Sequence, residues 1–250
     1  MPTVRKQGGG ILSGSRMFSF ITKRWNPLGG ECLHGCSYCW AQGPKGLAKK
    51  HNMKKYQGEP RLIESICKRF KADDFVFVCD MCDLFGDWVP SDDIKIVLGR
   101  IAGSPAQFLL LTKNPKRYLE MLDFLPKNAV LGCTIESDRC YPAVSNALNQ
   151  TERLEWMAIL ARIIQYRLGK GKQGNRLFVS VEPVLDFDRD IFSDYLCRWI
   201  GPWAVAVGYD NYKNRLLEPP LAKTIELIEA LERSGITVFR KTLREAWNEL

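Results

Sequence analysis

The chain has 250 residues, of which 46% are hydrophobic and 26% charged, so it is long enough for one large α/β domain with a substantial core. It has no run of about 18 uncharged apolar residues and no apolar segment at its start, which argues against a membrane span or signal peptide and predicts a cytoplasmic protein. Nine cysteines, an odd number, favour a reducing compartment over a disulfide framework, and the formal charge of +8 favours a polyanionic partner such as DNA or RNA.

The first 16 residues are rich in glycine, serine and basic side chains, so we expect an N-terminal arm over 1–16 followed by a single domain over 17–250. Apolar residues then alternate along Met17-Phe18-Ser19-Phe20-Ile21-Thr22, which predicts the first strand. The chain continues into Cys32-Leu33-His34-Gly35-Cys36-Ser37-Tyr38-Cys39, called the cysteine loop below. Parallel α/β sheets bind ligands at the carboxyl ends of their strands, and the cysteine loop is predicted at that edge.

The cysteine loop supplies three thiols, Cys32, Cys36 and Cys39, within eight residues, so that all three can meet at one centre. Thiolates bind iron–sulfur clusters and structural zinc, and both centres usually have four protein ligands. Three thiolates on a four-iron cluster leave one iron open to an outside ligand, which indicates a catalytic centre instead of a sealed structural site. The alternatives are a zinc site completed by a distant residue such as Cys67 or Cys133, and three cysteines buried as small apolar residues.

Between Trp40 and Pro60 the sequence is basic, with His51 and Tyr56 among its lysines. Such a segment can follow a phosphate backbone while an aromatic side chain stacks on a base, or it can be a solvated surface. From Pro60 onward apolar residues recur at helical spacing, which predicts a helix with Cys67 on its buried face.

Short continuous apolar runs, typical of strands buried on both faces, recur along the rest of the chain. The predicted strands are 75–78, 108–111, 130–135, 177–181, 203–208 and 236–239. Helical patterns separate them, including one with Ser91 as N-cap, one with Ile191, Tyr195, Leu196 and Trp199 on one face, and a tail helix after the last strand. The alternation predicts parallel βαβ units, and hence an α/β fold with an open, partial parallel barrel of about six strands.

Polar residues follow these strands where each strand ends. They include Cys79, Cys82, Asp83, Lys113, Glu136, Ser137, Glu182 and Asp210. Because the carboxyl ends of parallel strands share one edge of a sheet, we expect these side chains near the cysteine loop. One acidic residue at a strand end is usually a helix cap or surface carboxylate, but polar residues at five successive strand ends favour a site.

The cysteine spacing, with an aromatic residue before the third cysteine, resembles the radical S-adenosylmethionine superfamily. The resemblance implies a partial barrel and a [4Fe-4S] cluster on Cys32, Cys36 and Cys39. It also implies that the reduced cluster cleaves S-adenosyl-L-methionine to a 5′-deoxyadenosyl radical, with electrons from a reductant such as flavodoxin or ferredoxin.

The same resemblance implies contacts with the cofactor. Tyr38 would lie against the adenine, and Glu136 and Ser137 would bind the ribose. Lys113 would pair with the methionine carboxylate, as a lysine does in spore photoproduct lyase-like enzymes. Many members have a Gly-Gly-Glu-type run after the second strand; this chain departs from that pattern, and Asp83 would accept the amino hydrogens instead.

Two further strand ends are expected to face the substrate. Glu182 and Asp210 would project toward the substrate, and Glu182 is also expected among the cofactor-binding residues. Cys82 is placed to donate a hydrogen atom to a substrate radical, as a cysteine does in photoproduct lyase-like enzymes. Alternatively, Cys79 and Cys82 form a redox pair, bind an auxiliary cluster or pack in the core.

Most of the chain also resembles the phage-associated Gp37/Gp68-like group of radical S-adenosylmethionine proteins, over residues 25 to about 210. The matching segments are Trp25-Asn26-Pro27, Cys39-Trp40-Ala41, Asp83-Leu84-Phe85, Leu110-Leu111-Thr112-Lys113-Asn114-Pro115, Gly132-Cys133-Thr134-Ile135-Glu136 and Val181-Glu182-Pro183. This resemblance implies a fold and a cofactor but no substrate.

The leading hypothesis is therefore a radical S-adenosylmethionine enzyme that modifies or repairs a substrate, with nucleic acid as the first candidate. A protein or peptide substrate is the alternative within this class. The alternative from another class is a zinc-bearing nucleic-acid-binding module without catalysis.

Overall fold

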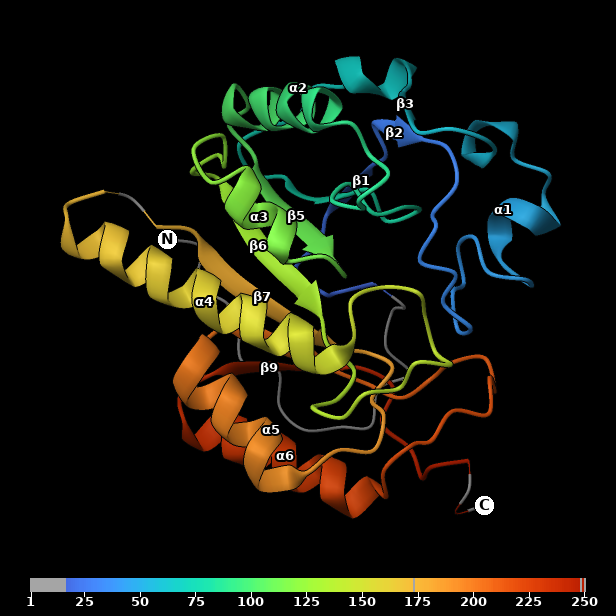
Figure 1. Ribbon diagram of the computed structural model, residues 1–250, viewed down its shortest axis with the longest axis vertical. Helices are drawn as coiled ribbons and strands as arrows, with labels where there is room; N and C mark the ends of the chain where they lie inside the picture. The colour runs from blue at the N-terminus through green and yellow to red at the C-terminus, as the bar shows by residue number, and fades with distance from the viewer. Residues whose placement is uncertain (1–16, 173, 248, 250) are drawn as a thin grey trace.

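The structure is a computed structural model that describes residues 17–172, 174–247 and 249, so the arm predicted over 1–16 lies outside the described residues. Seven strands form one parallel sheet in the order β1-β4-β5-β6-β7-β8-β9, which curls into a half-barrel (Figure 1). The α/β partial barrel predicted from the sequence is confirmed. The strands are β1 (Lys23–Trp25), β4 (Phe75–Val78), β5 (Gln107–Thr112), β6 (Ala129–Thr134), β7 (Arg176–Val181), β8 (Ala204–Val207) and β9 (Thr237–Arg240).

Five helices cover the outer face of the sheet (Figure 1). They are α2 (Ser91–Ala102), α3 (Lys116–Glu120), α4 (Gln150–Gly169), α5 (Arg189–Asp194), which continues as one π-helical turn (Tyr195–Ile200), and α6 (Leu221–Arg233), whereas the short helix α1 (Leu47–Lys50) lies away from the sheet. Two 3₁₀ turns (Lys54–Tyr56 and Glu64–Cys67) and an antiparallel pair, β2 (Leu28–Gly29) with β3 (Arg61–Leu62), flank the sheet. Helix α4 begins with a capping box, in which Asn149 and Glu152 each bond the other's backbone N–H at 2.9 Å.

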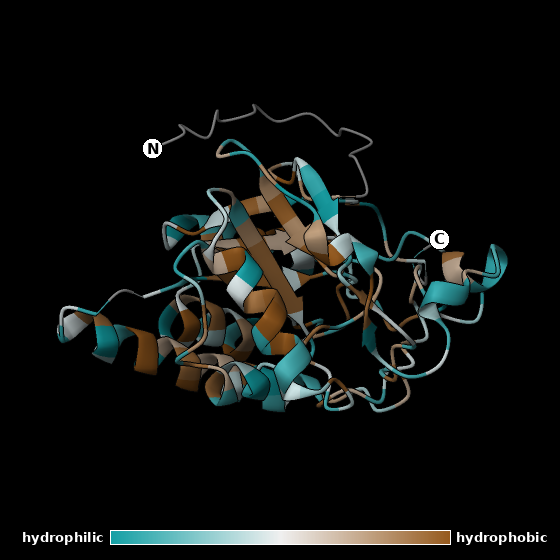
Figure 2. Ribbon diagram, turned by 90° about the horizontal axis from the view of Figure 1, so that it is seen from above, coloured by the Kyte–Doolittle hydropathy of each residue, from teal (hydrophilic) through white to brown (hydrophobic). Residues whose placement is uncertain are grey.

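The sheet buries side chains on both faces, because neighbouring residues of a strand point to opposite sides. In β5, Phe108 and Leu110 pack toward the helices, whereas Leu109 points to the concave face. In β8, Ala204 and Ala206 take the concave positions, and their small side chains leave room inside the half-barrel. Figure 2 shows the strands as mainly hydrophobic and the outer helices as mixed, which explains why the apolar runs located the strands.

The space inside the half-barrel is filled by residues 17–21, where the sequence predicted a strand. Phe18 lies edge-on to Phe178 at a ring distance of 5.0 Å, and Phe20 lies 4.8 Å from the ring of Phe239. The predicted strand is therefore wrong: the apolar side chains pack into the concave face, and the first strand begins only at Lys23.

Two predictions about apolar faces are also wrong. Cys67 is exposed, because the chain after Pro60 pairs β3 with β2 and then makes only one 3₁₀ turn instead of a helix. Of the second predicted face, Leu196 is buried and Tyr195 packs against the core as expected, but Ile191 and Trp199 are each 52% exposed. The face that turns inward consists of Phe192, Leu196 and Ile200, spaced four residues apart.

Two helix ends also differ from prediction. Ser91 is the first residue of α2 instead of its N-cap, and its hydroxyl accepts a hydrogen bond from Arg117 at 3.0 Å. The expected tail helix is absent from residues 241–247, the described part of the tail. Among the helices of the described residues, none is long and apolar enough to cross a membrane.

Candidate functional site

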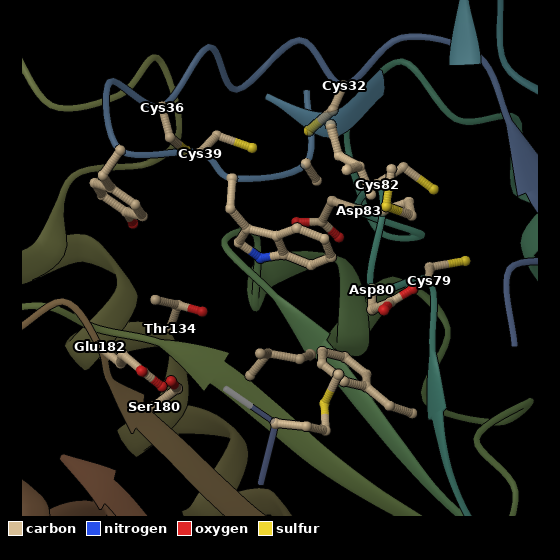
Figure 3. A pocket seen from close by; sticks show the side chains of 18 of the residues that line it. Cys32, Cys36, Cys39, Cys79, Asp80, Cys82, Asp83, Thr134, Ser180 and Glu182 are labelled. Atoms are coloured by element: carbon tan, nitrogen blue, oxygen red, sulfur yellow. The ribbon is translucent and has the colours of Figure 1, made fainter. Parts of the chain in front are cut away.

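The cysteine loop and the carboxyl ends of the strands enclose a cavity of about 850 Å³, called the main cavity below. Figure 3 shows Cys32, Cys36 and Cys39 on the loop above it, with the Cys79–Asp83 segment on one side and Thr134, Ser180 and Glu182 on the other. The predicted site residues that line the main cavity are Cys32, Cys36, Tyr38, Cys39, Cys82, Asp83, Lys113, Glu182 and Asp210. Two predicted residues, Glu136 and Ser137, lie behind its wall, since both are fully buried and neither lines it.

The backbone of the cysteine loop is held by a neighbouring connection of the chain. The Ser37 N–H donates to the carbonyl of Val144 at 2.8 Å, and the Asn146 N–H donates to the carbonyl of His34 at 2.7 Å. Gly35 has φ +55°, a left-handed conformation that glycine adopts without strain, so the loop reverses direction between its first two cysteines.

All three thiols of the loop are free and face one cavity, so the loop offers the donor set of an iron–sulfur cluster. Burial raises the pKa of Cys32 and of Cys36. Within residues 17–172, 174–247 and 249, no three His, Cys, Asp or Glu side chains are gathered tightly enough to hold a metal ion. The donor atoms therefore fit an iron–sulfur cluster in kind, and they line one cavity.

Cys67 and Cys133, the two distant cysteines considered as a fourth zinc ligand, are not at the main cavity. Cys133 is fully buried among the side chains between the sheet and its helices, and Cys67 is exposed elsewhere. Neither lines the main cavity.

Asp83, which follows β4, lies at the centre of a hydrogen-bond network. Its Oδ2 accepts from His34 Nε2 at 2.7 Å, from the Thr112 hydroxyl at 2.9 Å and from the Lys113 N–H at 2.8 Å. Burial opposes ionisation of this carboxyl, but the hydrogen bond and charge of His34 prevail and lower the pKa of Asp83. Asp83 is thus an ionised residue whose acceptor sites are already occupied.

Glu136, which follows β6, is the second buried carboxylate beside the loop. Its Oε2 lies 2.7 Å from Arg153 Nη2, and its Oε1 accepts a hydrogen bond from the Tyr38 hydroxyl. Burial opposes its charge, but Arg153 and Lys113 outweigh burial and lower the pKa of Glu136. The expected contacts of Glu136 and Ser137 with a ribose stay predictions; the Ser137 hydroxyl donates to the carbonyl of Asp186 at 2.6 Å.

Lys113 brings a cation into the cavity wall. Its ammonium lies 5.3 Å from the centroid of the Tyr38 ring. Burial opposes its charge, but Cys36 and Glu136 outweigh burial and raise its pKa, so it is protonated. Within the described part of the chain, no carboxylate oxygen lies within ion-pair distance of this ammonium.

Cys79 and Cys82 lie on the opposite side of the cavity from Glu182. Cys79 has φ +57°, and the Cys82 N–H reaches the carbonyl of Cys79 at 3.4 Å, so this segment turns as soon as β4 ends. The turn brings the two thiols together, and a hydrogen bond with Cys79, together with burial, raises the pKa of Cys82 well above its usual value.

Sequence reasoning missed three residues that the structure brings to the site. His34 stands between two cysteines, and that position was its only signal. Asp80 lines the cavity and accepts from Asn26 Nδ2 at 2.6 Å. Arg153 lies in the first turn of the long helix α4, where nothing in the sequence separates it from an ordinary surface arginine.

Comparisons with known proteins agree with this geometry at the level of the fold. The family model described as "Protein of unknown function (DUF5131)" matches residues 16–164, and no curated protein matches the chain. A mutant of spore photoproduct lyase superposes with a TM-score of 0.53 at 10% identity, over 94% of this chain and 81% of that one.

SuiB from Streptococcus suis superposes with a TM-score of 0.54 at 11% identity, over 90% of this chain and 50% of its own. SuiB bound to S-adenosylmethionine gives 0.54 at 12% identity, over 89% and 51%. This chain thus spans about half the length of SuiB. Both neighbours are radical S-adenosylmethionine enzymes, and the likeness establishes the shared partial barrel.

Proposed function

The chain belongs to the DUF5131 family, and we propose that this member is a radical S-adenosylmethionine enzyme. In this proposal Cys32, Cys36 and Cys39 hold a [4Fe-4S] cluster at the mouth of the half-barrel. One observation carries the proposal: three free thiols on one loop face a cavity at the carboxyl ends of a parallel sheet. The partial barrel shared with SuiB, solved with S-adenosylmethionine bound, supports it.

The cluster, once reduced, supplies the electron that cleaves S-adenosyl-L-methionine to methionine and a 5′-deoxyadenosyl radical. The protein's part is to bind and orient the cofactor. Lys113 offers its ammonium to the methionine carboxylate, because it is charged, lines the cavity and has no ion pair among the described residues. The ring of Tyr38 offers the adenine an apolar face in the same wall.

Cys82 is the proposed hydrogen-atom donor to the substrate radical. Its raised pKa keeps the thiol protonated at neutral pH, and only a protonated thiol has a hydrogen atom to give. Glu182 faces it from the other side of the cavity (Figure 3), so a substrate lying between them meets a thiol and a carboxyl group.

Nucleic acid is the proposed substrate, because one rim of the main cavity is strongly basic. Residues 40–55, called the lysine lobe below, contain five lysines, all exposed, and residues 32–58 contain no Asp or Glu. Lys45, Lys50 and the half-exposed Trp40 line the cavity, an arrangement that suits a phosphate backbone with a base on an aromatic ring. Tyr56, the aromatic expected to stack, is buried, so Trp40 takes that role.

The first experiment is anaerobic purification and cluster reconstitution, followed by iron and sulfide analysis and a dithionite-driven assay for 5′-deoxyadenosine. The Cys32/Cys36/Cys39→Ala variant should bind no cluster and form no nucleoside. A matched control, Cys67/Cys140→Ala, changes two exposed thiols outside the cavity and should behave like wild type. Stoichiometric zinc without iron or cleavage would instead establish the binding module.

The second experiment separates the two substrate classes. 5′-Deoxyadenosine formation is measured with no addition, with single-stranded DNA or RNA oligonucleotides, and with a peptide mixture. Stimulation by oligonucleotides alone supports the proposal. Stimulation by peptides alone would transfer the assignment to a peptide substrate, the kind of partner found in SuiB bound to its precursor peptide SuiA.

A further inference from the structure

Two buried carboxylates hold the cysteine loop from different strands of the sheet. Asp83, after β4, binds His34, which stands between Cys32 and Cys36. Glu136, after β6, binds Tyr38, which stands between Cys36 and Cys39. Each interval between successive cysteines is thus tied to the sheet by one side chain.

The carboxylate of Asp83 is itself held on several sides. Besides His34, it accepts from Thr112 and from the Lys113 N–H at the end of β5, and its Oδ1 accepts from the Phe85 N–H at 2.9 Å. His34 is further fixed by Trp88, whose ring lies edge-on at 4.8 Å. The first anchor of the loop therefore has little freedom to move.

The carboxylate of Glu136 is held by Arg153 of α4, and neither side chain is exposed. Arg153 in turn donates through Nη1 to the carbonyl of Thr134 and through Nε to the carbonyl of Asn149 at 3.4 Å. The second anchor thus joins the cysteine loop to the end of β6 and to the start of the longest helix.

We propose that Asp83 and Glu136, with Arg153 behind Glu136, are positioning residues that set the spacing of the three thiols, instead of ligands of the cofactor. This inference rests on the proposed function for its purpose, but the anchoring itself is a property of the chain. A metal-binding loop must be ordered before its ligands converge, and charge-assisted hydrogen bonds in a dry site order it in advance.

The position of Glu136 favours this role over ribose binding. A group that binds a ribose must reach the cavity, and Glu136 lies behind its wall. Asp83 does line the cavity, but its oxygens already accept four hydrogen bonds, so an amino group would have to compete for them.

The anchors are tested in the full chain before reconstitution, by the alkylation rate of each cysteine followed by mass spectrometry. Tyr38→Phe removes one hydroxyl and should raise the rates of Cys36 and Cys39 roughly tenfold, the change expected when a buried hydrogen bond to a charged group is lost. His34→Phe keeps a ring beside Trp88 and should raise the rates of Cys32 and Cys36 instead. Cys82 serves as the internal reference, with its rate unchanged.

The matched control is Tyr141→Phe, which likewise removes one tyrosine hydroxyl. That hydroxyl donates to the backbone carbonyl of Asp186 at 2.6 Å instead of to a loop anchor. It should leave all three loop thiols unchanged. Equal rates in wild type and Tyr38→Phe would overturn the proposal, and so would a uniform rise that includes Cys82, since that indicates general loosening.

Glu136→Gln separates positioning from cofactor binding once the cluster is loaded. The positioning role predicts roughly tenfold faster loss of iron to a chelator, with an unchanged dissociation constant for S-adenosyl-L-methionine per bound cluster. A ribose contact predicts the reverse pattern, which would overturn the proposal. If wild type takes up no iron, the proposed function fails, whereas the alkylation pattern still decides whether the anchors exist.

Discussion

Arg153 and Glu136 form an ion pair of 2.7 Å in which neither side chain is more than 1% exposed. Removing the arginine alone leaves a carboxylate charge buried without its partner, so Arg153→Met should lower the free energy of unfolding by about 3–5 kcal/mol. Urea denaturation measures this loss. The double variant Arg153→Met/Glu136→Leu removes both charges and should recover most of it; a double variant no more stable than the single one would contradict the pairing.

Phe18 anchors the segment that fills the half-barrel, where it contacts Phe77 and Phe178 and is 6% exposed. Phe18→Ala opens a cavity in this concave core and should cost about 3 kcal/mol of stability. Thermal and urea unfolding test the loss. Phe124→Ala, at a position 51% exposed, is the control and should change stability by only about 0.5 kcal/mol.

Gly30 lies just before the cysteine loop with φ +97°, and a Cβ there would meet the carbonyl oxygen of Glu59 at 2.6 Å. Gly30→Ala should therefore destabilise the protein by roughly 1–3 kcal/mol. Gly99 lies in α2 with open space around its missing side chain, and Gly99→Ala should stabilise the protein by about 0.5–1 kcal/mol. Urea unfolding curves should show that Gly30→Ala lowers the free energy of unfolding and that Gly99→Ala raises it. A change of the same sign in both variants would contradict the prediction.

Glu182 links stability to pH. Burial raises its pKa above the ordinary value of 4.5, although Lys241 and Asn211 offset part of the effect. A carboxyl whose folded pKa is raised favours folding below the unfolded value and loses that contribution as pH rises through the folded value. Glu182→Gln should therefore gain stability relative to wild type as the pH rises above 4.5. Unfolding temperatures across this range test it, with the exposed Glu155→Gln as a control that should track wild type.

The lysine lobe should control how nucleic-acid binding responds to salt. Lys45→Glu/Lys50→Glu should weaken binding of a labelled single-stranded oligonucleotide and lower the salt slope by about 1 for each lost phosphate contact. Fluorescence anisotropy at several salt concentrations measures both. Lys170→Glu/Lys172→Glu, beyond the far end of α4 (Figure 1), carries the same charge change and should have much less effect. Equal effects of the two pairs would indicate binding by net charge alone.

The sheet was predictable because its strands are buried on both faces. Runs such as Phe75–Val78 consist of apolar residues alone, which is the pattern of a strand buried on both faces. All of the predicted runs are strands of one sheet. The same logic failed at residues 17–21, because side chains that pack into a concave face alternate in the same way as those of a strand. It failed at Cys67 because pairing of β2 with β3, a long-range contact, left too few residues for a helix.

The members of the site were more predictable than their contacts. Strand-end position brought Asp83, Lys113 and Glu182 to the cavity, because parallel strands share an edge. It could not show that Glu136 turns away from the cavity to meet Arg153, since that choice depends on a helix that begins 14 residues later. Pairings between distant polar residues leave no periodic trace in a sequence.

The separation in sequence between the cysteine loop and its anchors has a consequence during synthesis. The three thiols leave the ribosome more than 100 residues before Arg153, which at 5–20 residues per second is roughly 5–20 s. During that interval the newly made thiols have no sheet to shelter them from oxidants or stray metal ions. The thiols of the cysteine loop are thus most vulnerable before synthesis of the chain is complete. Growth under oxygen should therefore lower the yield of chains able to accept iron more than the yield of folded chains.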